Sequence, residues 1–475
     1  MRGTGIAARS AAALAIAAMV GGGCSSAATS SSSSATAPAT PGSSSPAQAT
    51  GQPYQSFELD GFIVVKGSAP AMSPADDQGS AAAAELNDFG FDLLRHMDAN
   101  GNLCTSPTSI ALALAMVEPG AKGATAAEMS KVMHGFGADG QASEILALLR
   151  SLRSKTTYVD AQGSSILPGE SPDPANPDPV VELNIANQAF LQKGLSFEQQ
   201  YLDSLSAGFD SGIGVLDFQK DPQPSRLAIN KWAGDQTKGR IPSILQPDDI
   251  NEGTRFALAN AIYLKAAWDD KFDKANTKSR DFTTAGGSKV SVPTMAADEH
   301  LAYSAGPGYR AVELPYSGGT MSMTIVVPDD MAAFVGVLSQ AKLAALVAAE
   351  SSYDVDFTLP KFSINTRFEL GDALIAMGMP TVFSDGADLS GMAARGPLDP
   401  DGLKIDKVIH QANIDVVEDG TTAAAVTVVV GAIAGAAPEQ PPHVQFHVDK
   451  PFLYLIRDTE SGAMLFLGRV DDPSK

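Results

Sequence analysis

The 475-residue sequence contains only two cysteines, Cys24 and Cys104, and only six histidines. Cys24 lies within a leader-like N-terminus, so Cys104 has no partner in the rest of the chain. We therefore predict a fold without disulfides, although exported proteins often have them. We expect the lone Cys104 to be a small buried hydrophobe.

Familiar catalytic motifs are also missing. The sequence has no Gly-x-Ser-x-Gly elbow, no Walker loop, no His-Glu-x-x-His and no Cys-x-x-Cys. His443 and His447 have the spacing to share one side of a strand, but no third ligand lies near them in the sequence. We interpret both as structural, expect no metal or cofactor, and predict that the protein is not an enzyme.

Basic residues are scarce: 33 Lys and Arg stand against 54 Asp and Glu, a net charge of −21. This charge argues against nucleic acid as a partner and against polybasic attachment to anionic lipid. No long apolar run is present either, because the run at residues 11–20 is too short to cross a bilayer.

The N-terminus has the pattern of an export signal. Arg2 and Arg9 precede the short apolar run, and three glycines precede Cys24. The cysteine after small residues resembles a bacterial lipoprotein box, in which Cys24 would be diacylated; Gly21 departs from the aliphatic residue usual three positions earlier. We predict a signal peptide at 1–23 and a lipid anchor on the outer face of the cell membrane. Ordinary secretion is the alternative.

A spacer follows the leader, since residues 25–57 contain no charged residue and are rich in Ser, Ala and Pro. We assign residues 24–80 to the lipidated N-terminus and this spacer, although residues 62–65 could form a short strand. The globular domain is predicted to span 81–475, with an exposed Pro-rich loop at 167–179 and a helix N-cap at Ser106, before Pro107.

Hydrophobic periodicity predicts that helices come first and that strands, with a few helices, follow. This order favours an α+β fold with a large mixed sheet. The expected helices are 81–97, 108–117 and 230–237, and the expected strands are 181–190, 254–264, 321–327, 353–364, 445–457 and 463–470.

One segment, Glu418 to Ala437, fits neither an ordinary strand nor a membrane span. After an acidic turn it consists of small and β-branched residues, with no charge before Glu439. It is too long for a typical strand and too short for a membrane helix. Residues 421–434 would span about 45 Å when extended, and small uncharged side chains suit a strand buried on both faces.

The ordered set of motifs resembles the serpin family over roughly residues 81–472. The stretches that carry the resemblance are Asn102 to Ile110, Gly120 to Met129, Leu183 to Phe190, Ile229 to Trp232 with Thr237 to Ile241, Leu258 to Trp268, Val312 to Tyr316, Leu359 to Phe362, His410, Glu418 to Thr421, Pro451 with Phe452, and Gly468 to Val470.

This resemblance implies a fold of helices and three β-sheets, with a large central sheet and an exposed reactive-centre loop. It also implies suicide inhibition: a serine protease attacks the loop and forms an acyl-enzyme, and the cleaved loop then inserts into the central sheet and traps the enzyme. The alternative is a non-inhibitory member, acting as a surface binding or adhesion protein. We expect a monomer.

The resemblance also implies roles for individual residues. Counting seventeen residues from Glu418 makes Ala434–Gly435 the reactive bond, within one or two residues, because the stretch to Pro451 is a few residues longer than usual. No Lys or Arg lies between Glu418 and Lys450, so we predict an elastase-like or subtilisin-like target, or a papain-like one, rather than a trypsin-like one. The hinge would be Gly420, Thr421, Thr422, Ala423, Ala424 and Ala425, the shutter Ser106, Ser109, Asn260 and His410, and the breach Trp268, Lys361 and Glu418.

Overall fold

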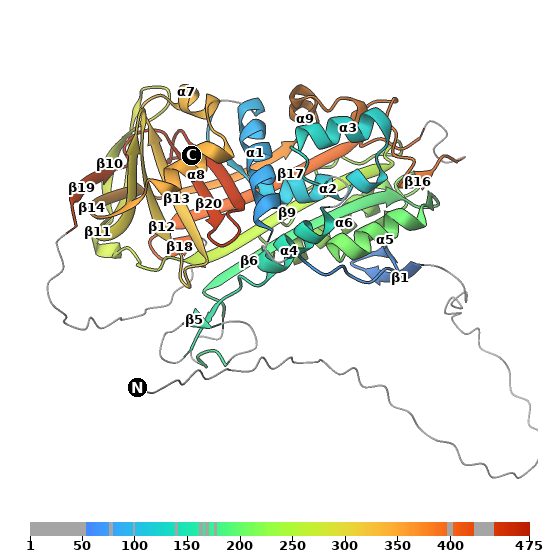
Figure 1. The fold of residues 1–475 in the computed structure, drawn as a ribbon, viewed down its shortest axis with the longest axis horizontal. Coiled ribbons are helices and arrows are strands. Elements are labelled where there is room, and N and C mark those ends of the chain that lie inside the picture. Colours follow the sequence, from blue (N-terminus) through green and yellow to red (C-terminus); the bar gives the residue numbers. More distant parts are fainter. Residues whose placement is uncertain are drawn as a thin grey trace, which may run out of the picture. The chain divides into compact units, whose positions relative to one another are not determined.

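Two large β-sheets, with helices packed over them, build the folded part of the chain (Figure 1). The computed structural model describes residues 54–75, 79–97, 100–137, 141–160, 165–166, 171–174, 178–396, 402–421 and 441–475. These residues lie in one compact unit that begins at Gln52. No helix among them is long and apolar enough to cross a membrane.

The main sheet has eight strands within the described residues, and both parallel and antiparallel pairs occur in it. In order across the sheet they are β1 (Tyr54–Leu59), β2 (Phe62–Gly67), β8 (Ile213–Leu216), β6 (Val181–Gln192), β9 (Phe256–Ala267), β18 (Gly420–Thr421), β17 (Lys407–Val417) and β15 (Phe362–Glu369).

The second large sheet is built around the long strand β11. Residues 289–294 of β11 pair with β10, residues 294–303 pair with β14, and residues 302–306 pair with β12. The strands are β19 (His443–His447), β14 (Ser351–Pro360), β11 (Lys289–Gly306), β12 (Tyr309–Pro315), β13 (Met321–Pro328), β20 (Phe452–Asp458), β21 (Met464–Val470) and β3 (Leu103–Thr105), with β10 (Lys278–Thr283) beside β11. Two small pairs also occur, β4 (Tyr158–Val159) with β5 (Ser165–Ile166) and β7 (Ser196–Phe197) with β16 (Ala393–Ala394).

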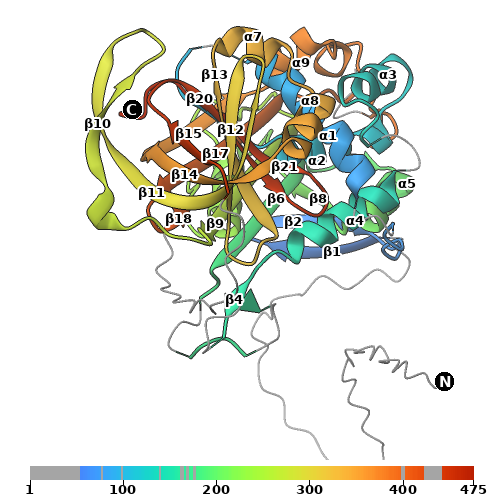
Figure 2. The ribbon, with the colours of Figure 1, turned by 60° about the vertical axis from the view of Figure 1, so that its left-hand side comes forward.

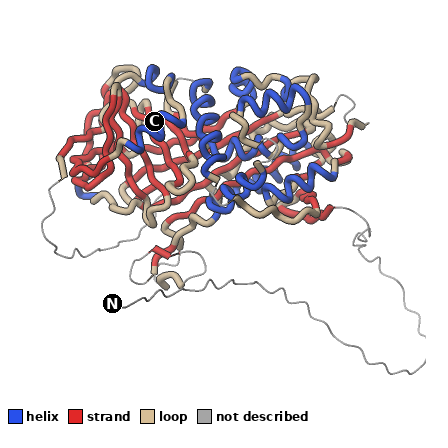
Figure 3. The backbone as a smooth tube through the Cα atoms, in the orientation of Figure 1, coloured by secondary structure: helices blue, strands red, loops and turns tan. Residues whose placement is uncertain are grey.

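The helices gather around the main sheet, while strands dominate the opposite end of the unit (Figure 3). They are α1 (Ser80–His96), α2 (Pro107–Ala115), α3 (Gly123–Val132), α4 (Ala142–Arg153), α5 (Gln199–Phe209), α6 (Pro222–Gln236), α7 (Met331–Gly336), α8 (Gln340–Ala348) and α9 (Gly371–Met377), with short 3₁₀ turns η1 (Glu118–Gly120), η2 (Lys274–Asn276) and η3 (Thr381–Phe383).

Helix α2 packs against β6 and β9 of the main sheet and against β21 of the second sheet. Every one of its side chains is buried, which agrees with its almost uniformly apolar sequence. Ser106 caps it as predicted, by accepting a hydrogen bond from the Ser109 N–H at 3.2 Å. On the other face of the main sheet, α6 contributes Trp232, whose ring packs edge-on against Phe190 of β6.

Two predicted strands are each two strands in the structure. The stretch 353–364 divides into β14 of the second sheet and β15 of the main sheet, separated by Lys361. The stretch 445–457 divides into β19 and β20, with Pro451 in the gap. Proline lacks an N–H: Pro360 is the last residue of β14 and Pro451 directly precedes β20, yet the apolar pattern continues past both residues and hides the breaks.

Two boundaries also need correction. Helix α6 begins at Pro222 rather than at residue 230, because prolines at 222 and 224 are tolerated in a first helical turn. The predicted spacer ends too late: Tyr54–Leu59 and Phe62–Gly67 form a hairpin whose second strand pairs with β8. The burial of β2 shows why, since Phe62 and Val64 fill the core beside α6.

Candidate hinge and sheet-opening site

A two-residue strand, β18, lies between the C-terminal ends of β9 and β17. Gly420 and Thr421 pair with Ala267 and Ala266 on one side, and with Val417 and Val416 on the other. Nearer their N-terminal ends, β9 and β17 pair directly with each other, from Ala257 with Lys407 to Ile262 with Ala412. The main sheet is therefore forked at one end, and the start of the predicted hinge occupies the fork.

Only glycine fits at the first position of this strand. Gly420 has φ of +143°, and a Cβ there would lie 2.1 Å from the Ala266 carbonyl oxygen. The missing side chain lets the chain turn from β17 back between the two strands.

Thr421 is anchored by an aromatic pair. Its side chain is 1% exposed, and its Oγ1 lies 2.6 Å from the Tyr316 hydroxyl. The Tyr316 ring stacks on Trp268 with centroids 4.6 Å apart and an interplanar angle of 6°. Burial raises the pKa of Tyr316, so the phenol stays protonated and able to hydrogen-bond. The hinge thus begins at a buried position whose side chain has a defined hydrogen-bond partner.

The predicted breach residues meet at the same place. The Glu418 carboxylate accepts hydrogen bonds from Lys361 Nζ and Thr277 Oγ1, both at 2.8 Å. Burial raises the pKa of Glu418, but these hydrogen bonds outweigh it and hold that pKa below its ordinary value. Because Lys361 separates β14 from β15, this ion pair fastens the hinge to the junction of the two sheets.

Trp268 holds the backbone on both sides of the hinge turn. Its indole Nε1–H donates to the Val417 carbonyl at 3.0 Å, and its backbone N–H donates to the Asp419 carbonyl at 3.2 Å. Asp419 also forms an ion pair with Lys274 at 2.7 Å. The sequence analysis did not single out Tyr316, Thr277 or Lys274 as site residues; Tyr316 lies within the quoted motif Val312 to Tyr316, which could have pointed to it.

The four predicted shutter residues form one buried network beneath the part of the main sheet where β9 and β17 pair directly. The Ser106 N–H donates to His410 Nε2 at 3.1 Å, and Asn260 Nδ2 donates to Ser109 Oγ at 2.7 Å. His410 Nδ1 bonds the Asn260 side-chain oxygen. His410 and Asn260 are opposite each other on β17 and β9, so their bond crosses the pair of strands that an inserted strand would separate.

These contacts set the tautomer of His410. Nε2 accepts from a backbone N–H, so the ring proton lies on Nδ1 and points to Asn260. Burial of the ring lowers the pKa of His410 to about 3, which keeps it neutral. A neutral imidazole can exchange partners without burying a charge.

Asn187 is a shutter residue that the sequence analysis missed. It lies on β6 opposite Asn260, and its side-chain oxygen accepts hydrogen bonds from both Asn260 and Ser109. It belongs to the quoted stretch Leu183 to Phe190, so the antiparallel register of two recognised strands could have pointed to it.

Several predicted residues lie outside the described part of the chain: Cys24, hinge residues 422–425 and the reactive bond 434–435. Cys104 is fully buried, as expected. His447 lies 3.3 Å from Asp356, and the described residues contain no group of three or more His, Cys, Asp or Glu that could hold a metal.

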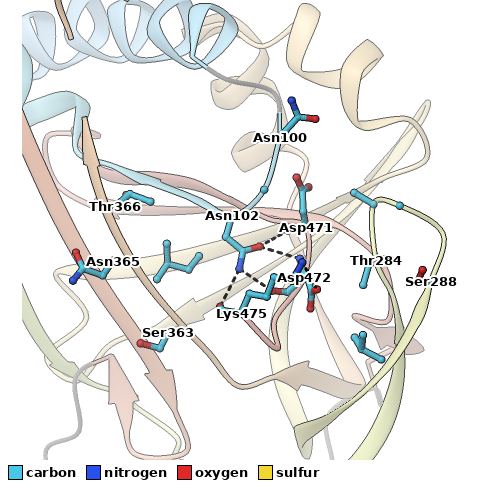
Figure 4. A pocket seen from close by; sticks show the side chains of 15 residues that line it. Asn100, Asn102, Thr284, Ser288, Ser363, Asn365, Thr366, Asp471, Asp472 and Lys475 are labelled. Atoms are coloured by element: carbon cyan, nitrogen blue, oxygen red, sulfur yellow. Dashed lines mark hydrogen bonds and ion pairs between the residues drawn. The ribbon is translucent and has the colours of Figure 1, made fainter. Parts of the chain in front are cut away.

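A cavity of about 660 Å³, lined mostly by residues with polar side chains, lies beside β15 and the chain's C-terminal residues (Figure 4). Asn102 lies in its wall, where it donates to the Asp472 carbonyl at 2.7 Å and accepts from the N–H groups of Asp471 and Asp472. The quoted motif that begins at Asn102 thus fastens the end of the chain, and we assign the cavity no ligand.

A family model described as "Serpin (serine protease inhibitor)" matches residues 84–473. The chain belongs to the serpin family. Iripin-8 of Ixodes ricinus is 33% identical over 420 residues, covering 86% of this chain and 98% of that protein. Serpin B3 of Homo sapiens and a leukocyte elastase inhibitor of Xenopus laevis are each 32% identical, covering 81% of this chain and 97% of the relative.

Solved serpin structures share the fold. The thermophilic serpin tengpin in the native state aligns with a TM-score of 0.70 at 23% identity, covering 86% of this chain and 97% of tengpin. Uncleaved ovalbumin aligns with a TM-score of 0.67 at 24% identity, covering 82% and 100%. These likenesses confirm the serpin fold, with helices, several sheets and a large central sheet, and the family is one of serine protease inhibitors.

Proposed function

We propose that this serpin is a suicide inhibitor of serine proteases with small or aliphatic specificity, and that it traps the acyl-enzyme by inserting its cleaved loop between β9 and β17. The observation that carries the proposal is β18. Gly420 and Thr421 already occupy the fork of the main sheet, in register with both neighbours. Insertion would lengthen a strand that already exists.

The register of β18 predicts where the reactive bond would travel. Continuing the pairing of Thr421 with Ala266 places residue 431 opposite Phe256, the last residue at the far end of β9. Residue 434 would then extend about 10 Å beyond the sheet. The bound protease would move from one end of the main sheet to the other.

The chemistry belongs to the protease. Its serine hydroxyl attacks the Ala434 carbonyl carbon and gives its proton to the protease's own base. The Ala434–Gly435 bond breaks, Gly435 leaves as an amine, and an ester joins Ala434 to the serine. Water normally hydrolyses this ester; insertion of the loop competes with that step and distorts the protease first.

Specificity follows from the uncharged loop. An elastase-like or subtilisin-like pocket accepts a small or aliphatic residue before the cleaved bond, whereas a trypsin-like pocket requires Lys or Arg. Relatives named leukocyte elastase inhibitor support an elastase-like target. The test is incubation with elastase, subtilisin and trypsin, followed by denaturing electrophoresis. A stable, roughly 1:1 complex with elastase or subtilisin is expected; cleavage of the loop without a complex would contradict the proposal.

We further propose that the protein is exported and anchored by a lipid on Cys24, with secretion as the alternative. The support is the basic, apolar and small-residue order of the first 24 residues. Mass spectrometry of the N-terminal peptide should find a diacylated Cys24 at a new N-terminus. An intact leader, or cleavage at another residue, would contradict the anchor.

A further inference from the structure

The hairpin of β1 and β2 lies outside the residues that the serpin family model matches. It adds two strands to the edge of the main sheet, and β1 is the outermost strand (Figure 2). Two large apolar side chains of the hairpin are exposed: Phe57 is 48% accessible and Leu59 is 37% accessible. On helix α6 beside its tip, Leu227 is 57% accessible.

These three side chains form what we call the tip patch. Phe57 and Leu59 are opposite Val64 and Phe62, so they point to the face of the sheet that α6 covers. Leu227 precedes Ala228, which packs beside Gly61 in the hairpin turn. Isolated exposed apolar residues are ordinary, but a group of them on one surface indicates a contact site.

The hairpin is held firmly enough to present this patch. The Phe62 ring packs edge-on against Phe190 with centroids 5.1 Å apart, and Phe190 packs against Trp232 of α6 in turn. Asp60 in the turn pairs with Lys231 of α6 at 2.8 Å. Lys231 and Asp60, the charged residues beside the patch, are thus already paired with each other, which lowers the electrostatic cost of covering the patch.

Strand register places the tip at the end of the main sheet farthest from the hinge. Ile63 is opposite Val215, Val215 pairs with Leu191, and Leu191 pairs with Phe256. The turn at Asp60 and Gly61 extends two to three residues past that level, or about 10 Å. Figure 1 shows β1 and β18 at opposite ends of the unit.

We propose that the tip patch is a contact surface for the acylated protease after loop insertion. This inference rests on the proposed function. The inserted strand would carry the ester about 10 Å past Phe256, to the level of the hairpin turn. The partner is therefore the trapped protease, seated against the far end of the sheet.

The lateral distance allows this contact. From the inserted strand to β1, which carries Phe57 and Leu59, there are five strand spacings, through β9, β6, β8 and β2, or roughly 24 Å at 4.8 Å each. A compact protease domain of roughly 230 residues is about 44 Å across. A protease attached at the ester is therefore wide enough to cover the tip patch, and the contact would help to keep its distorted active site pressed against the inhibitor.

Cysteine labelling tests the contact on the full exported chain. Leu59→Cys places an exposed thiol within the tip patch, in a Cys24→Ser background; Cys104 is buried and burial raises the pKa of its thiol to about 12, so it stays unlabelled. Lys289→Cys on β11, at the hinge end, is the control. We expect the maleimide labelling rate of Leu59→Cys to fall at least tenfold in the elastase complex, with Lys289→Cys little changed.

The lifetime of the complex gives a second measurement. The double variant Phe57→Ser, Leu59→Ser should release active protease roughly tenfold faster, while Val337→Ser, which removes an exposed apolar side chain near α7, should not. A trapped complex with unchanged Leu59→Cys labelling and unchanged lifetime would overturn the inference alone. Protection of Leu59→Cys that depends on inhibitor concentration without protease would overturn it too, by assigning the patch to a dimer. Failure to form any complex would contradict both the proposed function and this inference.

Discussion

Replacing Thr421 with arginine tests the insertion proposal most directly. Thr421 is buried between β9 and β17, and its hydroxyl bonds the Tyr316 phenol. Arginine would displace β18 from the fork in the uncleaved protein, so that insertion would then have to bury a guanidinium among two backbone strands and an aromatic pair. Even after relaxation, such a charge costs several kcal/mol.

That cost decides the fate of the acyl-enzyme. If about 3 kcal/mol appears in the barrier to insertion, insertion slows by roughly a hundredfold. Hydrolysis of the ester then overtakes insertion, and Thr421→Arg becomes a substrate. Titration of an elastase-like or subtilisin-like protease should show many inhibitor molecules consumed per enzyme, with no denaturant-stable complex.

Thr421→Val is the matched control. Its size and shape are close to threonine, and it loses only the hydrogen bond to Tyr316, worth about 1 kcal/mol. It should inhibit with a stoichiometry near that of the wild type. Inhibition by Thr421→Arg at the wild-type rate and stoichiometry would refute insertion through the fork, provided that both variants show a cooperative thermal transition.

The remaining predictions concern stability and specificity. Cleavage near Ala434 should raise the thermal transition strongly because the freed loop can complete the sheet; an unchanged transition, read by circular dichroism, would favour the non-inhibitory alternative. Ala434→Arg should create a trypsin inhibitor or substrate where the wild type is neither, and trypsin resistance of the variant would place the reactive bond elsewhere. Burial lowers the pKa of His410 to about 3, below the ordinary 6.5, so the unfolded chain binds a proton between these pH values that the folded chain does not. Acidification from pH 6.5 should therefore lower the free energy of unfolding by about 1.4 kcal/mol per pH unit from this group, and His410→Asn should make that slope shallower.

Much of the architecture was readable from local patterns. The Ser106–Pro107 start of α2, the strands at β6 and β9, and the uncharged stretch after Asp419 each follow from residue types at short range. Motif order then pointed to the family. The errors occurred where the apolar pattern was continuous but the strand was interrupted, as at Lys361 and Pro451. Periodicity reports which face of a strand is buried, and not which sheet a residue joins.

The sequence alone settled the chemistry of the hinge segment: no charge, small side chains and a glycine at its turn. It could not show that Gly420 and Thr421 already lie in the sheet, because that outcome depends on Ala266, Tyr316 and Val416, residues brought together only by folding. The same holds for Asn187 in the shutter and for the hairpin at 54–67, whose short apolar pattern resembled an extension of the spacer. Pairing between distant strands is a competition among many partners, so tertiary structure decided where this loop begins to insert.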